Sequence, residues 1–254
     1  MTFVIPWAWF YVLGRIIGFV VMAPVWSWNA IPPWLMGVFA LGLTVAVTPG
    51  ITAAAPSSWV VLGIGFGGQV VVGMAMGLTL AVVLAGVEMA GTIVTNLLGI
   101  GLGASADPAV TVTDAGLSTI FALLAMLAFV AAGGLLLSVQ VLHDSFMALP
   151  IGQFPILSIP WLTGLGQTLF GTALLFGAPL LGAVLLVIFA IGVLNRAFPS
   201  MSAYFLALPT AILLVLILLW LFLPDMPDLL NGLWTAAWST LSHLLALWST
   251  VHGH

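Results

Sequence analysis

The sequence predicts an all-α, polytopic membrane protein, on the evidence of its charge, its hydropathy and the spacing of its prolines. Two basic and six acidic residues make up 3% of 254 residues, against roughly 25% in an ordinary soluble domain. Hydrophobic residues account for 63% of the chain, and its mean hydropathy is +1.35. This small number of polar side chains cannot cover a particle of this size in water. The apolar surface must therefore face lipid or other proteins.

Composition also excludes several function classes. The net charge of −4 comes from scattered acids, which leaves no basic surface for nucleic acid. The chain has no cysteine, and therefore no disulfide, thiol nucleophile or thiolate metal site. The motifs of zinc proteases, serine hydrolases and P-loop proteins do not occur in it. We therefore expect neither catalysis nor a cofactor.

Prolines bracket the first two predicted helices, which cover residues 7–23 and 34–48. Proline disrupts a helix interior but suits the first helical turn. The second helix is short for a membrane span, and we expect a loop over residues 50–58. The bracketing prolines are Pro6, Pro24, Pro32, Pro33 and Pro49.

Residues 59–103 contain no proline. As one helix they would reach roughly 70 Å, about twice the hydrocarbon core of a bilayer. We therefore expect a bent or hairpin element here. Its glycines recur at the spacing that lets helix backbones approach closely in lipid. The pairs are Gly63 with Gly67, Gly73 with Gly77, and Gly99 with Gly103.

The second half of the chain alternates between long apolar runs and short breaks. A polar, glycine-rich loop is expected over residues 101–116, followed by an apolar helix over 117–149 that breaks near Gly133 and Gly134. A loop with two prolines follows over residues 152–161.

The last third of the chain contains three apolar segments. Residues 162–195 surround Pro179, and a second run covers 203–223. The sequence PDMPD at 224–228 ends that run, and its aspartates favour the start of another helix. From Leu229 onward, apolar residues recur at i, i+3 and i+4, which predicts an amphipathic helix that faces protein or the membrane interface.

Three charged residues in apolar surroundings are candidates for function, because ionisable groups are costly in a membrane. Glu88 would be a proton or cation carrier in one interpretation. In the other it forms a structural hydrogen bond or an ion pair with Arg15 or Arg196. A self-contained secondary transporter would use Glu88 and Arg196 to bind substrate or a coupling ion near the membrane midplane.

Several short motifs occur in a fixed order over roughly residues 10–215. They are Arg15 with Gly18 and Pro24, then SADPAV at 105–110, HDSFMALPIG at 143–152 and LNRAFPSMSAYFLALP at 194–209. In this order and spacing the chain resembles the FliR family of flagellar type III export-gate proteins, whose counterpart in virulence secretion systems is SctT.

The resemblance implies a non-enzymatic subunit of a protein-conducting gate in the bacterial inner membrane, at the flagellar basal body. Such a subunit assembles with FliP-like and FliQ-like subunits, meets FlhB-like and FlhA-like export proteins, and passes unfolded export substrates. The resemblance also implies one domain, 1–254, built from bent helical hairpins and similar to a fusion of a FliP-like part, 1–198, with a FliQ-like part, 199–254. In the assembled gate much of this bundle is displaced towards the periplasm.

By the same resemblance, the loop over residues 99–116 matches the plug of the closed pore. Glycines permit a mobile loop, and its apolar side chains would form a dry constriction. The alternatives are an ordinary surface loop and an assembly scaffold without pore contact. The expected plug residues are Gly101, Leu102, Gly103, Ala104, Ser105, Ala106, Asp107 and Pro108. The expected structural or interface residues are Arg15, Glu88, Arg196 and Pro199.

Overall fold

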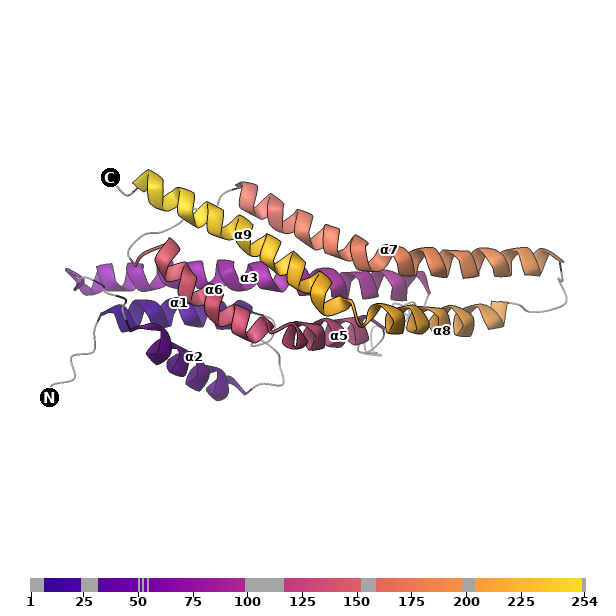
Figure 1. Cartoon of the computed structure of the whole chain (residues 1–254), viewed down its shortest axis with the longest axis horizontal. Coiled ribbons are helices and arrows are strands. Elements are labelled where there is room, and N and C mark those ends of the chain that lie inside the picture. Colours follow the sequence, from indigo (N-terminus) through magenta and orange to yellow (C-terminus); the bar gives the residue numbers. More distant parts are fainter. Residues whose placement is uncertain are drawn as a thin grey trace. The chain divides into compact units, whose positions relative to one another are not determined.

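The computed structural model describes residues 7–23, 32–49, 51, 53, 55–98, 117–151, 159–197 and 204–252, and every regular element in these ranges is an α-helix (Figure 1). The helices are α1 (Ala8–Met22), α2 (Pro33–Val47), α3 (Trp59–Leu97), α5 (Leu117–Ala131), α6 (Gly134–Ala148), α7 (Ile159–Ala197), α8 (Tyr204–Phe222) and α9 (Met226–His252).

Two helices in the described part of the chain are long and apolar enough to cross a membrane. They are α3, over Trp59–Leu97, and α7, over Trp161–Arg196. The number of candidate spans rises to four if α5 with α6, and α8 with α9, each form one bent span. The prediction of a polytopic, all-helical membrane protein is therefore confirmed.

The first two helices end within one residue of their predicted bounds. Pro33 occupies the first turn of α2, where a missing backbone N–H costs no hydrogen bond because that N–H has no partner in the helix. Thr44 and Thr48 each donate a hydroxyl hydrogen bond to the backbone carbonyl four residues earlier, at Ala40 and Thr44 respectively. These bonds satisfy hydroxyl groups that are buried among apolar side chains.

The prediction of a bent or hairpin element over residues 59–103 is wrong for its first 39 residues, which form the single helix α3. No proline interrupts them, so the ladder of backbone hydrogen bonds stays intact. Each glycine in a helix costs roughly 0.5–1 kcal/mol relative to alanine, but several of the glycines in α3 lie against other helices and allow close packing there. The remainder of the predicted element, residues 99–103, lies outside the described residues.

The predicted break near Gly133 is confirmed. Helix α5 ends at Ala131, and α6 begins at Gly134. Gly133 has a φ of 75°, a left-handed conformation that glycine adopts without the steric cost that other residues meet. This residue therefore separates the two helices.

The last three helices also follow the predicted order. Helix α7 continues through Pro179, and α8 ends at Phe222. Asp228 lies in the first turn of α9, where a negative charge is favourable. Residues 226, 230, 234 and 237 are buried whereas 231, 235 and 239 are exposed. The amphipathic pattern is thus confirmed for the first half of α9.

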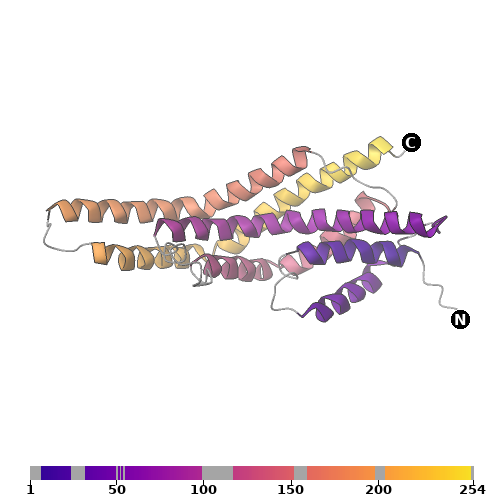
Figure 2. The same cartoon turned by 180° about the vertical axis from the view of Figure 1, so that it is seen from behind.

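The chain forms two compact units. The first comprises Met1–Val82, Gly133–Gly166 and Trp234–His254, and the second comprises Val83–Ala132 and Gln167–Leu233. In the first unit, α1 lies beside the first half of α3 in both views (Figures 1 and 2). The indole Nε1 of Trp234 donates a 3.3 Å hydrogen bond to the backbone carbonyl of Leu80, which ties α9 to α3.

In the second unit, the last part of α3 packs against α5 and α7. An added Cβ at Gly86 would lie 2.6 Å from Cβ of Thr172 in α7, and one at Gly91 would lie 2.8 Å from the ring of Phe121 in α5. Both spacings are too short for a side chain. The two glycines therefore set how closely these helices approach.

Candidate functional site

Of the residues predicted to carry function, Arg15 is the one that the structure places in a buried cluster of hydrogen-bonded polar groups. The eight expected plug residues, 101–108, and Pro199 lie outside the described residues. Arg15 is fully buried in α1, whereas Glu88 in α3 and Arg196 at the end of α7 are exposed.

The guanidinium of Arg15 bonds to two other helices of the first unit. Its Nε donates to Oε1 of Gln69 in α3 at 2.8 Å. Its Nη1 donates to the backbone carbonyl of Ser145 at 2.8 Å and to the Ser145 hydroxyl at 3.1 Å. Its Nη2 donates to the backbone carbonyl of Leu149 at 2.9 Å. The planar fork of arginine therefore joins α1, α3 and the end of α6.

The hydrogen-bond partners of Arg15 are neutral groups. The buried cation is stabilised by backbone carbonyls at the C-terminal end of α6. The last carbonyls of a helix have no partner within it, and they carry the negative end of the helix dipole. The carbonyls of Ser145 and Leu149 lie at this end of α6 and both accept from the guanidinium. The Ser145 carbonyl also accepts from the backbone N–H of Leu149, which follows the helix. The ring of Phe146 adds a cation–π contact, with its centroid 4.1 Å from Cζ of Arg15.

Sequence reasoning did not identify Gln69 and Ser145 as partners of Arg15. It expected Arg15 to be available to Glu88, but the guanidinium is bonded to neutral acceptors instead. The sequence did contain an indication of the role of Gln69, which is a lone amide in a run of glycine and apolar residues. A polar side chain buried in such surroundings needs a hydrogen-bond partner. Within the described residues, the amide Nε2 of Gln69 is buried without a hydrogen bond.

Glycines hold α1 against α3 at the level of Arg15. An added Cβ at Gly73 would collide with the backbone carbonyl oxygen of Arg15, and one at Gly18 would collide with that of Val70. An added Cβ at Gly77 would lie 2.7 Å from the carbonyl oxygen of Phe19. The predicted role of Gly73 and Gly77 in close packing is therefore confirmed.

The predicted pair Gly63 and Gly67 behaves differently. An added Cβ at either position meets no atom of the described residues within 4 Å. Their spacing matches that of Gly73 and Gly77, so spacing alone does not distinguish a packed pair from an open one.

Glu88 and Arg196 do not form a combined site. Both side chains are exposed, and among the described residues neither has an ion-pair partner. The backbone carbonyl of Glu88, rather than its carboxylate, accepts a 3.1 Å hydrogen bond from the Thr92 hydroxyl. The structure thus offers no support for substrate or ion binding between these two charges.

A model of the family described as bacterial export proteins, family 1, matches residues 7–237. The chain belongs to this family. The match contains all eight described helices in whole or in part, together with residues 99–116. It also contains Arg15 and the residues that contact its guanidinium, which are Gln69, Ser145, Phe146 and Leu149 and which we call the arginine cluster.

Relatives of this bacterial export protein include the flagellar biosynthetic protein FliR of Escherichia coli (strain K12). The two are 27% identical over 241 residues, which is 93% of this chain and 92% of that protein. FliR of Pectobacterium carotovorum is 26% identical over 93% of this chain and 92% of its own length. The secretion system apparatus protein SsaT of Salmonella typhimurium is 25% identical and covers 62% of each chain. The resemblance to the FliR family is thereby confirmed.

Proposed function

We propose that this export protein is a non-enzymatic membrane subunit of the flagellar type III protein export gate. The observation that carries the proposal is the family match, which extends over residues 7–237 and is accompanied by nearly full-length similarity to FliR proteins. The bacterial inner membrane at the flagellar basal body is the proposed location, with displacement towards the periplasm in the assembled gate.

The apolar surface of the chain supports assembly with other subunits. In the membrane-span window of α7, 22% of the residues are buried within this chain, compared with 61% in that of α3. Phe189 and Trp220 are each 71% exposed, and Leu186 is 70% exposed. Large apolar side chains with this exposure require lipid or partner helices to cover them. The proposed partners are FliP-like, FliQ-like, FlhB-like and FlhA-like proteins.

The proposed pore plug is the loop over residues 99–116, and deletion of residues 104–110 tests it. The full chain is expressed in cells that lack their own copy of the gene, and membrane permeability to ions is measured along with protein abundance. We expect the deletion to leak ions at normal abundance. Replacement of the same seven residues by glycine and serine preserves the loop length, and is expected to leak less than the deletion does. If the membrane of the deletion strain were as impermeable to ions as that of the unchanged strain, the proposal that this loop is the pore plug would be contradicted.

Contact with unfolded export substrates can be tested by crosslinking, which the cysteine-free sequence makes unambiguous. A Ser105→Cys variant is expected to capture an arrested export substrate. A Trp59→Cys variant is the matched control, because Trp59 is 81% exposed but lies outside the loop. Efficient export without capture at residue 105 would favour a scaffold that has no pore contact.

The fold is proposed to combine a FliP-like part, 1–198, with a FliQ-like part, 199–254. In this arrangement the arginine cluster would stabilise the first part, since all its members lie between residues 15 and 149. We do not propose the secondary transporter, because Glu88 and Arg196 are exposed and unpaired among the described residues.

A further inference from the structure

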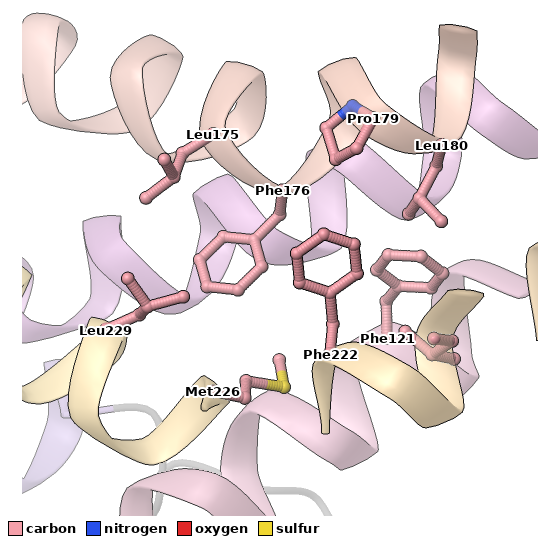
Figure 3. A pocket seen from close by; sticks show the side chains of 9 residues that line it. Phe121, Leu175, Phe176, Pro179, Leu180, Phe222, Met226 and Leu229 are labelled. Atoms are coloured by element: carbon pink, nitrogen blue, oxygen red, sulfur yellow. The ribbon is translucent and has the colours of Figure 1, made fainter. Parts of the chain in front are cut away.

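The second unit contains an apolar cavity of about 70 Å³ between α7 and the junction of α8 with α9 (Figure 3). Leu175, Phe176 and Pro179 line it from α7, while Phe222 and Met226 line it from the other side. Figure 3 shows the rings of Phe176 and Phe222 between these two elements. An apolar space of this size stays dry, so its walls lack the dispersion contacts that a filled core would provide.

A break in helical hydrogen bonding lies on each side of this cavity. Pro179 is inside α7 and has no N–H, so the helical hydrogen bond to the carbonyl of Leu175 cannot form. Opposite, residues 223–225 form a turn between α8 and α9, and Phe222 and Met226 flank that turn. Prolines and turns are the positions at which helical elements bend.

The part of α7 that precedes Pro179 is held firmly by α3. Thr172 is fully buried, and its Cβ lies where a side chain at Gly86 would have to go. Gly177 lies against Ala90, with an added Cβ at 3.4 Å from Cβ of that alanine. Close backbone approach at these points resists movement, because there are no flexible side chains between the helices to adjust.

The part of α7 that follows Pro179 is held weakly by comparison. Leu180 and Val184 are buried, but none of residues 185–196 is buried in the described chain. Helix α8 lies beside this part of α7 in both views (Figures 1 and 2) and buries Ala211 and Val215. We call residues 180–197 with α8 the distal hairpin.

We propose that the distal hairpin swings as one body about Pro179 and the turn at residues 223–225, and that the cavity is the space into which it moves. A close-packed interior would oppose the motion, since packed cores do not deform continuously. Met226 and the two phenylalanines can change rotamer to line a smaller cavity. The inference concerns the mechanics of this chain and does not depend on the proposed export function.

The swing can be measured as a distance distribution between nitroxide labels, since the chain has no native cysteine. Asn96 in α3 and Val193 in α7 are exposed and are changed to cysteine in the full chain, reconstituted in lipid nanodiscs. Val193 lies fourteen residues beyond Pro179, about 21 Å along a helix, so a swing of about 20° moves it by about 7 Å. A second pair, at Val193 and Leu213, lies within the distal hairpin and reports its internal rigidity.

We expect the distribution for Asn96–Val193 to be broader than that for Val193–Leu213 by about this displacement of 7 Å. Pro179→Ala is expected to narrow it by restoring the helical hydrogen bond. Leu219→Trp is expected to narrow it with Pro179 intact by filling the cavity, which Leu219 lines. Met226→Phe fills the same space and replaces Leu219→Trp if that variant does not fold.

Pro209→Ala is the matched control, because Pro209 is also a proline within a helix of this hairpin but does not line the cavity. It is expected to leave both distributions unchanged. An Asn96–Val193 distribution as narrow as that of the internal pair would overturn the proposal. So would a broad distribution that neither Pro179→Ala nor the cavity-filling variants narrow.

Discussion

The Nε of Arg15 donates to Oε1 of Gln69 at 2.8 Å, so a buried cation and a buried amide, 54 residues apart in sequence, satisfy each other between α1 and α3. Both side chains are fully buried. A buried donor or acceptor that loses its partner costs roughly 1–3 kcal/mol. Removal of either residue should therefore destabilise the first unit.

Arg15→Met should lower the free energy of unfolding by at least about 3 kcal/mol, because it removes several hydrogen bonds from a charged donor at once. Arg15→Lys should also destabilise, since an ammonium lacks the planar fork that reaches acceptors on two sides. Thermal unfolding of the purified chain in detergent measures both. Arg196→Met is the control: this exposed residue is the other arginine of the chain, and an equal loss there would contradict a special role for Arg15.

Gln69→Leu should cost roughly 1–3 kcal/mol, because Nε of Arg15 then loses its acceptor. Gln69→Glu keeps an acceptor oxygen, removes the amide N–H group that has no partner among the described residues, and places an anion beside the cation. We expect it to remain within about 1 kcal/mol of the unchanged protein. The same unfolding measurement compares the two variants. If Gln69→Leu were as stable as Gln69→Glu, the hydrogen bond would be unimportant.

Gly73→Ala should destabilise the chain by about 1–3 kcal/mol or more, because the added Cβ overpacks the contact with the backbone of Arg15. Gly67→Ala is the matched control in the same helix. Its Cβ meets open space, and alanine is favoured over glycine in a helix by roughly 0.5–1 kcal/mol. We therefore expect opposite signs in the shift of the melting temperature. A similar loss at both positions would mean that glycine spacing, rather than local contact, is what matters.

Glu88→Gln should leave flagellar protein export unchanged, since the exposed carboxylate has no ion-pair partner among the described residues. Motility and the amount of secreted flagellar protein are measured in cells that carry this variant as their sole copy. Abundance of the variant is determined in parallel. Loss of export at normal abundance would revive the hypothesis of a proton or cation carrier at this position.

Sequence patterns located the helices well where a local residue decides the outcome. Pro33 and Gly133 act through their own backbones, so the start of α2 and the break between α5 and α6 could be read directly. The continuity of α3 could not, because the bend was inferred from the length of the segment relative to a bilayer, and that length does not by itself interrupt a helix whose glycines pack against other helices. Contacts with residues far away in sequence also explain why Arg15 was singled out correctly while its partners Gln69 and Ser145 were not.

The end of α6 has a consequence for synthesis of the protein. The carbonyls of Ser145 and Leu149 accept hydrogen bonds from a side chain that precedes them by 130 and 134 residues, and the Ser145 carbonyl also accepts from the backbone N–H of Leu149. Domains fold largely from the N-terminus as the chain emerges from the ribosome. Until residue 149 has been synthesised, the guanidinium of Arg15 therefore needs water or a temporary partner to accept its hydrogen bonds. A single arginine thus constrains the order in which the helices insert into the membrane.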